Sequence, residues 1–117
     1  MKNQLSSTSF WILSALASGR MHGYAILRDV ERSTEGDVTL RVTTLYAALE
    51  RLEADDLIRQ DGEQVVDGRA RRYFVLTDSG RLRLQESADR MQRAADHARS
   101  RIRPQAPHLA PPKAAEA

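Results

Sequence analysis

Three arginines stand within residues 69–72, directly after the pair Asp67-Gly68. An Asp-Gly pair accepts the positive φ angles of a tight turn, so it predicts a hairpin whose tip lies beside the arginines. Guanidinium groups bind phosphate through paired hydrogen bonds, and this chemistry suits contact with a DNA backbone or insertion into a minor groove. Protection of an exposed edge strand by charge is the alternative. Strand alternation predicts one face with Arg69, Arg71 and Tyr73 and another with Arg72, Phe74 and Leu76.

A second candidate for DNA contact is the helix expected at residues 42–54. Its apolar positions recur at spacings of 3, 4 and 3 residues and predict a buried stripe of Val42, Leu45, Leu49 and Leu52. The opposite face and its flanks carry Thr43, Thr44, Tyr46, Ala47, Glu50 and Arg51. Short threonines allow close approach to a groove, Tyr46 can reach a phosphate, and Arg51 can form a paired contact with guanine. An ordinary solvated helix surface is the alternative.

The remaining elements place these two candidates in one fold. The first helix is expected from Ser6–Thr8 to just before Gly19, with a buried face of Phe10, Leu13, Leu16 and Ala17 that is widened by Leu5 and Ile12. A second helix is expected from His22-Gly23 to about Glu35, and a short strand at 38–40. Strands at 57–66 and 69–76 then lead to a helix capped by Thr77 and reaching Arg103. This order predicts a mainly α (α+β) winged helix-turn-helix at 1–76, a dimerisation helix at 77–103, and a disordered tail rich in proline and alanine at 104–117.

The last helix carries a heptad seam, which predicts assembly with a second copy. Six residues recur at intervals of 4, 3, 4, 3 and 4: Leu84, Ala88, Met91, Ala95, Ala98 and Ile102. Because the winged domain is expected to end near Leu76, a partner helix is the natural cover for this seam. A helix folded back on its own domain is the alternative.

Trp11 is the only tryptophan, and the helical wheel directs it away from the expected core, toward a side of serines and alanines. Packing at the dimer interface is the favoured interpretation, since aromatic anchors are typical of interfaces. The second interpretation is an aromatic wall for a planar effector, in a pocket shared with Ala15 and Met91.

Composition excludes several classes of function. The chain has 117 residues and no cysteine, which excludes disulfides, thiolate metal sites and cysteine nucleophiles. Its three histidines are scattered, so we expect no metal site and no cofactor, and no catalytic constellation is apparent. Residues 59–103 carry eleven basic and seven acidic side chains, a balance that suits an anionic partner. The apolar run Phe10–Ala17 is short for a secretory signal, which favours an N-terminal helix and a cytoplasmic protein.

Four motifs together resemble the PadR family of bacterial transcriptional regulators: His22-Gly23-Tyr24, the run 44–53 (TLYAALERLE), Arg71-Arg72-Tyr73, and 76–80 (LTDSG). The chain is similar in length to the short subfamily, which has a single C-terminal dimerisation helix. The resemblance implies a homodimeric winged-helix repressor on a pseudo-palindromic operator of double-stranded DNA, released in some members by a small aromatic effector. The DNA contacts that it implies are Tyr24, Thr43, Thr44, Tyr46, Arg69 and Arg71.

This sequence departs from the family pattern at three places. Arg41-Val42-Thr43 replaces the usual Ser-Pro-Gly-like entry to the third helix, and Ala47 replaces the proline that usually follows the motif tyrosine. The last helix also lacks the tryptophan that binds ligand in one relative. A winged-helix module that binds another protein instead of DNA is the alternative function, and the excess of acidic residues in the first half of the chain would suit it.

Overall fold

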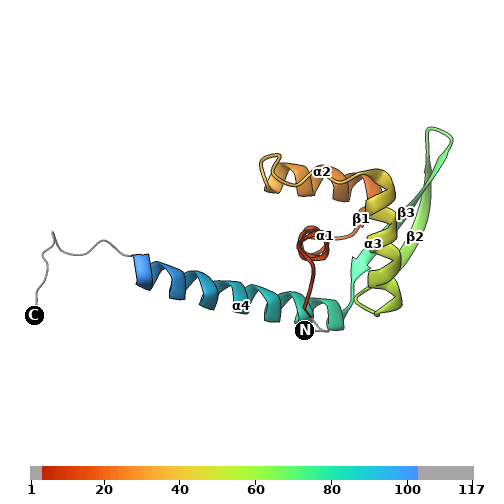
Figure 1. Ribbon diagram of the computed structural model, residues 1–117. Coiled ribbons are helices and arrows are strands. Elements are labelled where there is room, and N and C mark those ends of the chain that lie inside the picture. Colours follow the sequence, from red (N-terminus) through yellow and green to blue (C-terminus); the bar gives the residue numbers. More distant parts are fainter. Residues whose placement is uncertain (1–3, 103–117) are drawn as a thin grey trace, which may run out of the picture. The chain divides into compact units, whose positions relative to one another are not determined.

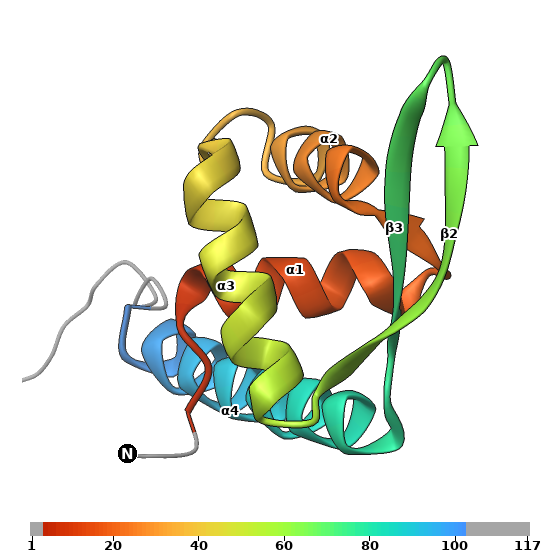
Figure 2. The same ribbon diagram turned by 90° about the vertical axis from the view of Figure 1, so that its right-hand side faces the viewer.

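The computed structural model describes residues 4–102 and divides into two compact units, one ending at Ser87 and the other beginning at Ala88. The first unit contains three helices, a three-stranded sheet and the first turns of α4 (Asp78–Ile102) (Figure 1). It is the winged helix-turn-helix predicted from the order of elements, mainly α with a small antiparallel sheet. Figure 2 shows α3 crossing in front of α1, with α2 beside them and the β2–β3 hairpin projecting past the helices.

The three helices of the first unit begin and end at the signals expected of them. Helix α1 (Ser7–Ala17) is capped by Ser6, whose Oγ accepts from the N–H of Ser9 at 3.1 Å. Helix α2 (Gly23–Ser33) follows His22 and is followed by Gly36, which has a φ of 85°. Helix α3 (Val42–Ala54) has the predicted bounds, although Arg41 gives it no side-chain cap among the described residues.

The hairpin is closed by the predicted turn. Strands β2 (Ile58–Val66) and β3 (Arg69–Leu76) pair antiparallel, and the turn between them has positive φ at both Asp67 (52°) and Gly68 (77°). Positive φ at both central residues is the geometry for which Asp-Gly is selected. The two strands therefore form a wing with the arginines of β3 next to its tip.

The third strand is not at 38–40, and that prediction is wrong. The third strand of the sheet is β1 (Met21–His22). It pairs with β3, so that the strand order is β1-β3-β2 and His22 lies opposite Tyr73. The N–H of Val38 donates to the Thr34 hydroxyl at 3.0 Å, and Val38 and Leu40 pack against the core. Residues 38–40 thus bury apolar surface without joining a β ladder.

The core lies between the three helices and the sheet, and its buried members include Ile12, Leu13, Ala15, Leu16, Ile26, Val30, Leu45, Ala48, Leu49, Leu52, Leu57, Ile58 and Phe74. Three expectations about it are wrong. Val42 is 58% exposed because it stands at the solvent-facing start of α3, and Ala17 is exposed. Trp11 packs against the core instead of pointing away from it. Helix α1 contacts α2, α3 and β3, so it buries a wider arc than one amphipathic stripe.

Thr77 and Gly80 join the start of α4 to the winged unit. The Thr77 hydroxyl donates to the Asp56 carbonyl at 2.7 Å and accepts from the N–H of Gly80 at 2.9 Å. A Cβ at Gly80 would overlap the Leu57 carbonyl oxygen, so only glycine fits this close approach. Leu84, one of the seam residues, packs against the core. The boundary expected at Leu76 thus falls inside the first compact unit.

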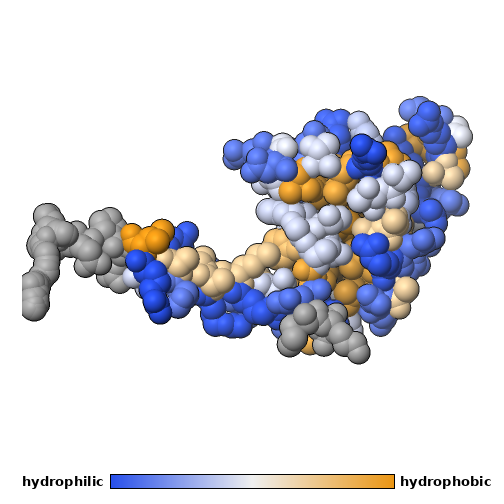
Figure 3. All heavy atoms as spheres, viewed as in Figure 1, coloured by the Kyte–Doolittle hydropathy of each residue, from blue (hydrophilic) through white to orange (hydrophobic). Residues whose placement is uncertain are grey.

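The second unit contains the rest of α4, up to Ile102. Apolar and alanine side chains follow one side of this segment and hydrophilic ones the other (Figure 3). Met91 is 49% exposed and Ile102 76% exposed. Arg103 and the tail predicted at 104–117 lie outside the described residues. Between residues 4 and 102, no helix is both long and apolar enough to cross a membrane.

Candidate nucleic-acid interface

The wing, the start of α2 and the first turns of α3 surround a hollow, here called the wing hollow. Its lining consists of His22, Gly23, Tyr24, Tyr46 and Arg69–Arg72. Four of the residues predicted to contact DNA therefore lie together: Tyr24, Tyr46, Arg69 and Arg71. Tyr24 is 56% exposed and Tyr46 40% exposed, so both residues reach the surface at this hollow. None of the described residues that line the hollow is acidic.

Gly23 allows α2 and α3 to approach each other at this hollow. A Cβ at Gly23 would collide with the Tyr46 hydroxyl and ring, so any larger residue would displace that tyrosine. Gly23 is also the first residue of α2, directly after its capping residue His22. The run His22-Gly23-Tyr24 therefore supplies the cap, the room for Tyr46, and a second exposed tyrosine.

Arg71 and Tyr73 lie on one face of β3, as strand alternation predicts. Arg71 Nη1 is 3.3 Å from His22 Nε2, and the His22 ring meets the edge of Tyr73 at 5.3 Å between centroids. Burial, and then the neighbouring Arg71 charge, lower the pKa of His22 below its ordinary value. Tyr73 donates from its hydroxyl to Gln64 at 2.8 Å, so it packs within the wing.

Arg20 fixes the base of the wing. Its guanidinium donates to the Asp61 backbone carbonyl at 3.0 and 2.8 Å and to the Asp61 carboxylate at 3.0 Å. The same group lies 4.0 Å from the centroid of the Tyr73 ring. Asp61 and Gly62 occupy the irregularity between Gln60 and Glu63, where β2 changes register against β3. Arg20 thereby ties this bulge to the body of the domain.

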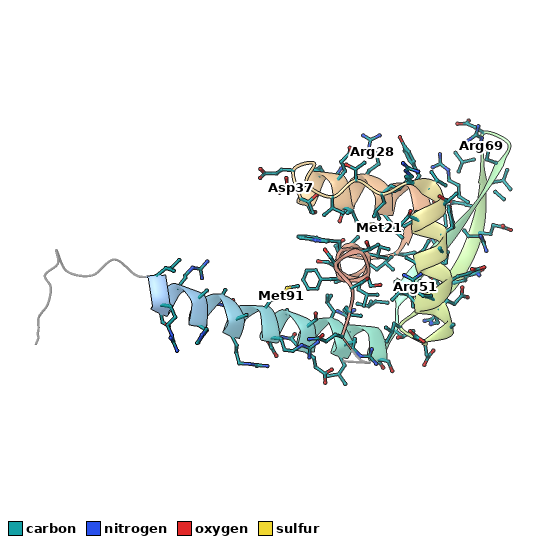
Figure 4. All side chains as sticks on the ribbon, in the orientation of Figure 1. Met21, Arg28, Asp37, Arg51, Arg69 and Met91 are labelled. Carbon is teal, nitrogen blue, oxygen red and sulfur yellow. The ribbon has the colours of Figure 1, made fainter. Side chains whose placement is uncertain are left out.

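A second hollow, here called the α3 hollow, lies between the exposed face of α3 and β3. Its lining is Thr43, Tyr46, Ala47, Leu49, Glu50, Glu53, Arg72 and Phe74. Thr43 thus joins Tyr46 along one surface, whereas Thr44 is exposed but lines neither hollow. Arg51 is exposed on the last turns of α3, away from the wing tip where Arg69 lies (Figure 4). Of the predicted contacts, Thr44 and Arg51 are therefore not brought into either hollow.

Arg28 is a candidate that the sequence interpretation missed. Its Nη1 donates to the Tyr24 hydroxyl at 3.0 Å, and this bond is the main cause that raises the pKa of Arg28. Arg28 on α2 and Arg69 on the wing lie toward the same side of the first unit (Figure 4). The spacing of four residues between Tyr24 and Arg28 on a helix was the signal that could have revealed it.

The predicted effector pocket loses one of its three residues. Ala15 is 2% exposed within the core, so it offers almost no surface to a ligand, because α1 buries more of its circumference than expected. Trp11 is half-buried and meets the edge of Phe10 at 5.4 Å between centroids. No group of three or more histidine, aspartate or glutamate side chains that could hold a metal ion occurs within residues 4–102.

Three helices, an antiparallel wing with arginines beside its tip, and an exposed face on the third helix define a winged helix-turn-helix protein of the DNA-binding class. The chain belongs to the PadR-like family of transcriptional regulators, whose family model matches residues 12–86. It is therefore a DNA-binding transcriptional regulator and not an enzyme.

Individual relatives agree with this assignment. The chain is 34% identical over 92 residues to the transcriptional regulator Rv3488 of Mycobacterium tuberculosis, covering 79% of this chain and 82% of that protein. Its fold is similar to that of a PadR family regulator from Clostridium difficile, with a TM-score of 0.65, 24% identity, and coverage of 83% and 98%. It is also similar to a PadR-like regulator from Bacillus cereus, with a TM-score of 0.68, 18% identity, and coverage of 83% and 92%.

Proposed function

We propose that the protein is a homodimeric repressor that binds a pseudo-palindromic operator of double-stranded DNA. The observation that carries this proposal is the wing hollow, where Tyr24, Tyr46, Arg69 and Arg71 converge with no acidic residue among the described lining. A repressor of this kind would act by occupying its operator and excluding other proteins from it. Two copies of α3 would then meet major grooves about 34 Å apart, one turn of the duplex.

Within each copy, binding would be divided between the wing and α3. The wing arginines would contact phosphates and provide most of the affinity, because neutralising phosphates releases counterions from the duplex. Thr43 and Tyr46 would approach the major groove, with Thr44 beside them and Ala47 placed to meet a thymine methyl group. Arg51 would contact a base or phosphate only at the far end of α3. We therefore expect its replacement to lower the affinity for DNA less than replacement of the wing arginines does.

The dimer is proposed on the amphipathic segment of α4 in the second unit. Its seam residues Ala88, Met91, Ala98 and Ile102 are exposed within one copy and Ala95 is half-buried, which leaves apolar surface for a second copy to cover. Leu84 packs against the core of its own domain and would support the seam from one end. Trp11 remains a proposed interface residue.

Ala98→Glu should weaken the dimer, because it places a carboxylate in the apolar seam. We expect the dissociation constant of the dimer to rise tenfold or more in sedimentation equilibrium, since burying an unpaired charge is costly. Ser100→Glu introduces the same charge on the opposite side of the helix and is the matched control. If both variants remain as dimeric as the unmodified protein, the seam is not the interface.

We also propose that a small planar aromatic effector releases the DNA. Trp11 is the only tryptophan of the chain and is half-buried, so its fluorescence reports directly on any aromatic molecule that stacks near it. Quenching by such a molecule, together with weaker operator binding, is the expected result. An unchanged spectrum across a broad panel of planar aromatics would count against an effector at Trp11.

The proposed function is tested by the affinity of the purified protein for duplex DNA across a salt series. A dimeric regulator should bind more weakly as salt rises, with a slope that reflects several phosphate contacts per copy. A winged-helix module that binds only other proteins would show no salt-sensitive binding to any duplex, and that result would overturn the proposal.

A further inference from the structure

The His22 ring lies between two hydrogen-bond donors. Its Nδ1 accepts from the backbone N–H of Ala25 at 3.2 Å, and its Nε2 is 3.3 Å from Arg71 Nη1. A neutral imidazole has only one acceptor nitrogen, because the other carries the proton. The ring can therefore accept from one of these neighbours and not from both.

The cap on α2 decides which nitrogen accepts. The N–H of Ala25 belongs to the first turn of α2, where backbone donors have no partner within the helix. Arg71 is only half-buried and can direct its remaining donors to solvent. Nδ1 is thus the acceptor and Nε2 carries the proton. Since burial and Arg71 lower the pKa of His22, the ring is neutral at and above neutral pH.

With this tautomer, His22 and Arg71 both present donors and cannot bond to each other. Both line the wing hollow together with Tyr24, Tyr46 and Arg69, whose side chains carry hydroxyl or guanidinium donors. The acceptor that satisfies such a set is an anion with several oxygens, and a phosphodiester has two free oxygens of this kind.

We infer that the wing hollow seats one phosphate of the DNA backbone, bound by the neutral Nε2–H of His22 together with the guanidinium of Arg71. This inference rests on the proposed DNA binding and adds His22 as a direct, uncharged phosphate ligand. His22 would then have two functions through its two nitrogens, since Nδ1 caps α2 while Nε2 holds the phosphate. The cap fixes the tautomer that makes Nε2 a donor.

The variant His22→Asn separates the two functions. Asparagine is a favoured N-cap and preserves an acceptor for Ala25, but it has no group in the place of Nε2–H. At pH 8 we expect DNA affinity to fall about tenfold with the melting temperature nearly unchanged. The slope of log affinity against log salt should stay as it is, because no charge is removed. Arg71→Ala is the contrasting variant and should lower that slope by about two for the dimer, one for each copy.

Two results from this variant would overturn the inference. Unaltered affinity in a stably folded His22→Asn protein would show that Nε2 contacts no phosphate. A slope lowered by about two, one for each copy of the dimer, would show that His22 binds as a cation. If the unmodified protein shows no salt-dependent binding to any duplex, the proposed function fails first, and the two failures are thereby distinguished.

Nitrogen NMR of the unmodified protein tests the tautomer without any variant. We expect the Nε2-protonated form in the free protein and a shift of that resonance when duplex DNA is added. A proton on Nδ1 would overturn the inference. Inorganic phosphate, added at matched ionic strength, should perturb Nε2 far less than the duplex does. An equal effect would identify a site for free phosphate instead and overturn the assignment to DNA.

Discussion

Replacing both Arg69 and Arg71 with alanine is expected to weaken DNA binding by the dimer about a hundredfold or more near physiological salt, and to lower the salt slope by about four, two for each copy. Both residues line the wing hollow; Arg69 directly follows the turn that forms the wing tip, and the guanidinium of Arg71 lies beside His22. Each arginine would neutralise one phosphate, so each replacement by alanine removes one contact that releases counterions. The loss should be similar across DNA sequences, because phosphate contacts position the protein without reading bases.

Binding titrations on an operator duplex, once it has been recovered from genomic DNA, and on an unrelated duplex, each at several salt concentrations, measure this effect. Arg81→Ala combined with Arg93→Ala removes the same charge from exposed positions on α4 and is the matched control. This control should change the slope little. Loss of sequence preference with an unaltered slope would contradict the assignment of the wing arginines to phosphates.

Gly80→Ala should be the most destabilising single substitution at the start of α4. Alanine is ordinarily the better helix former, so a helical glycine would be expected to gain stability when replaced. Here the added methyl group would overlap the Leu57 carbonyl oxygen, which is backbone and cannot move aside without disturbing its hydrogen bond from the Thr77 N–H. We expect the free energy of unfolding to fall by about 3 kcal/mol.

Chemical denaturation of the Gly80→Ala protein tests this, with Ser79→Ala as the control. Ser79 is exposed on the same turn of the same helix, so its replacement should leave stability unaltered or raise it slightly. A Gly80→Ala protein as stable as the Ser79→Ala protein would show that α4 does not approach Leu57 this closely. The same contact explains why the motif at 76–80 ends in glycine, whereas the sequence alone shows only that this motif resembles one in the PadR family.

The elements that could be predicted from the sequence are those specified by local signals. The extent of α3, the Asp67-Gly68 turn and a capping residue within 6–8 each depend on a few neighbouring residues, and these three predictions are confirmed, although Val42 of the predicted α3 stripe is exposed. The third strand could not be predicted, because its pairing joins Met21 and His22 to residues about fifty positions later. Val38 and Leu40 pack against the core from a loop, and valine and leucine can bury their side chains there as well as in a strand.

Only part of the candidate site could be predicted, because local signals reveal single residues but not the contacts between distant segments. Arginines beside a turn and tyrosines near helix starts can be recognised one element at a time, and the fold brings them to one hollow. The sequence places His22 at the start of the second helix, but it does not show that His22 neighbours Arg71, since the two are 49 positions apart in the chain. The burial of Ala15 could not be predicted, because the helical periodicity of α1 does not show how many other elements pack around that helix.

Selection of genomic DNA fragments by the purified protein, at two salt concentrations, tests the central claim most directly. A dimeric operator-binding regulator should recover an inverted repeat whose half-sites lie about one helical turn, roughly 34 Å, apart, with fewer fragments but the same repeat at higher salt. Recovery of unrelated fragments that are all lost at moderate salt, or of none at either concentration, would contradict a dimeric operator-binding regulator.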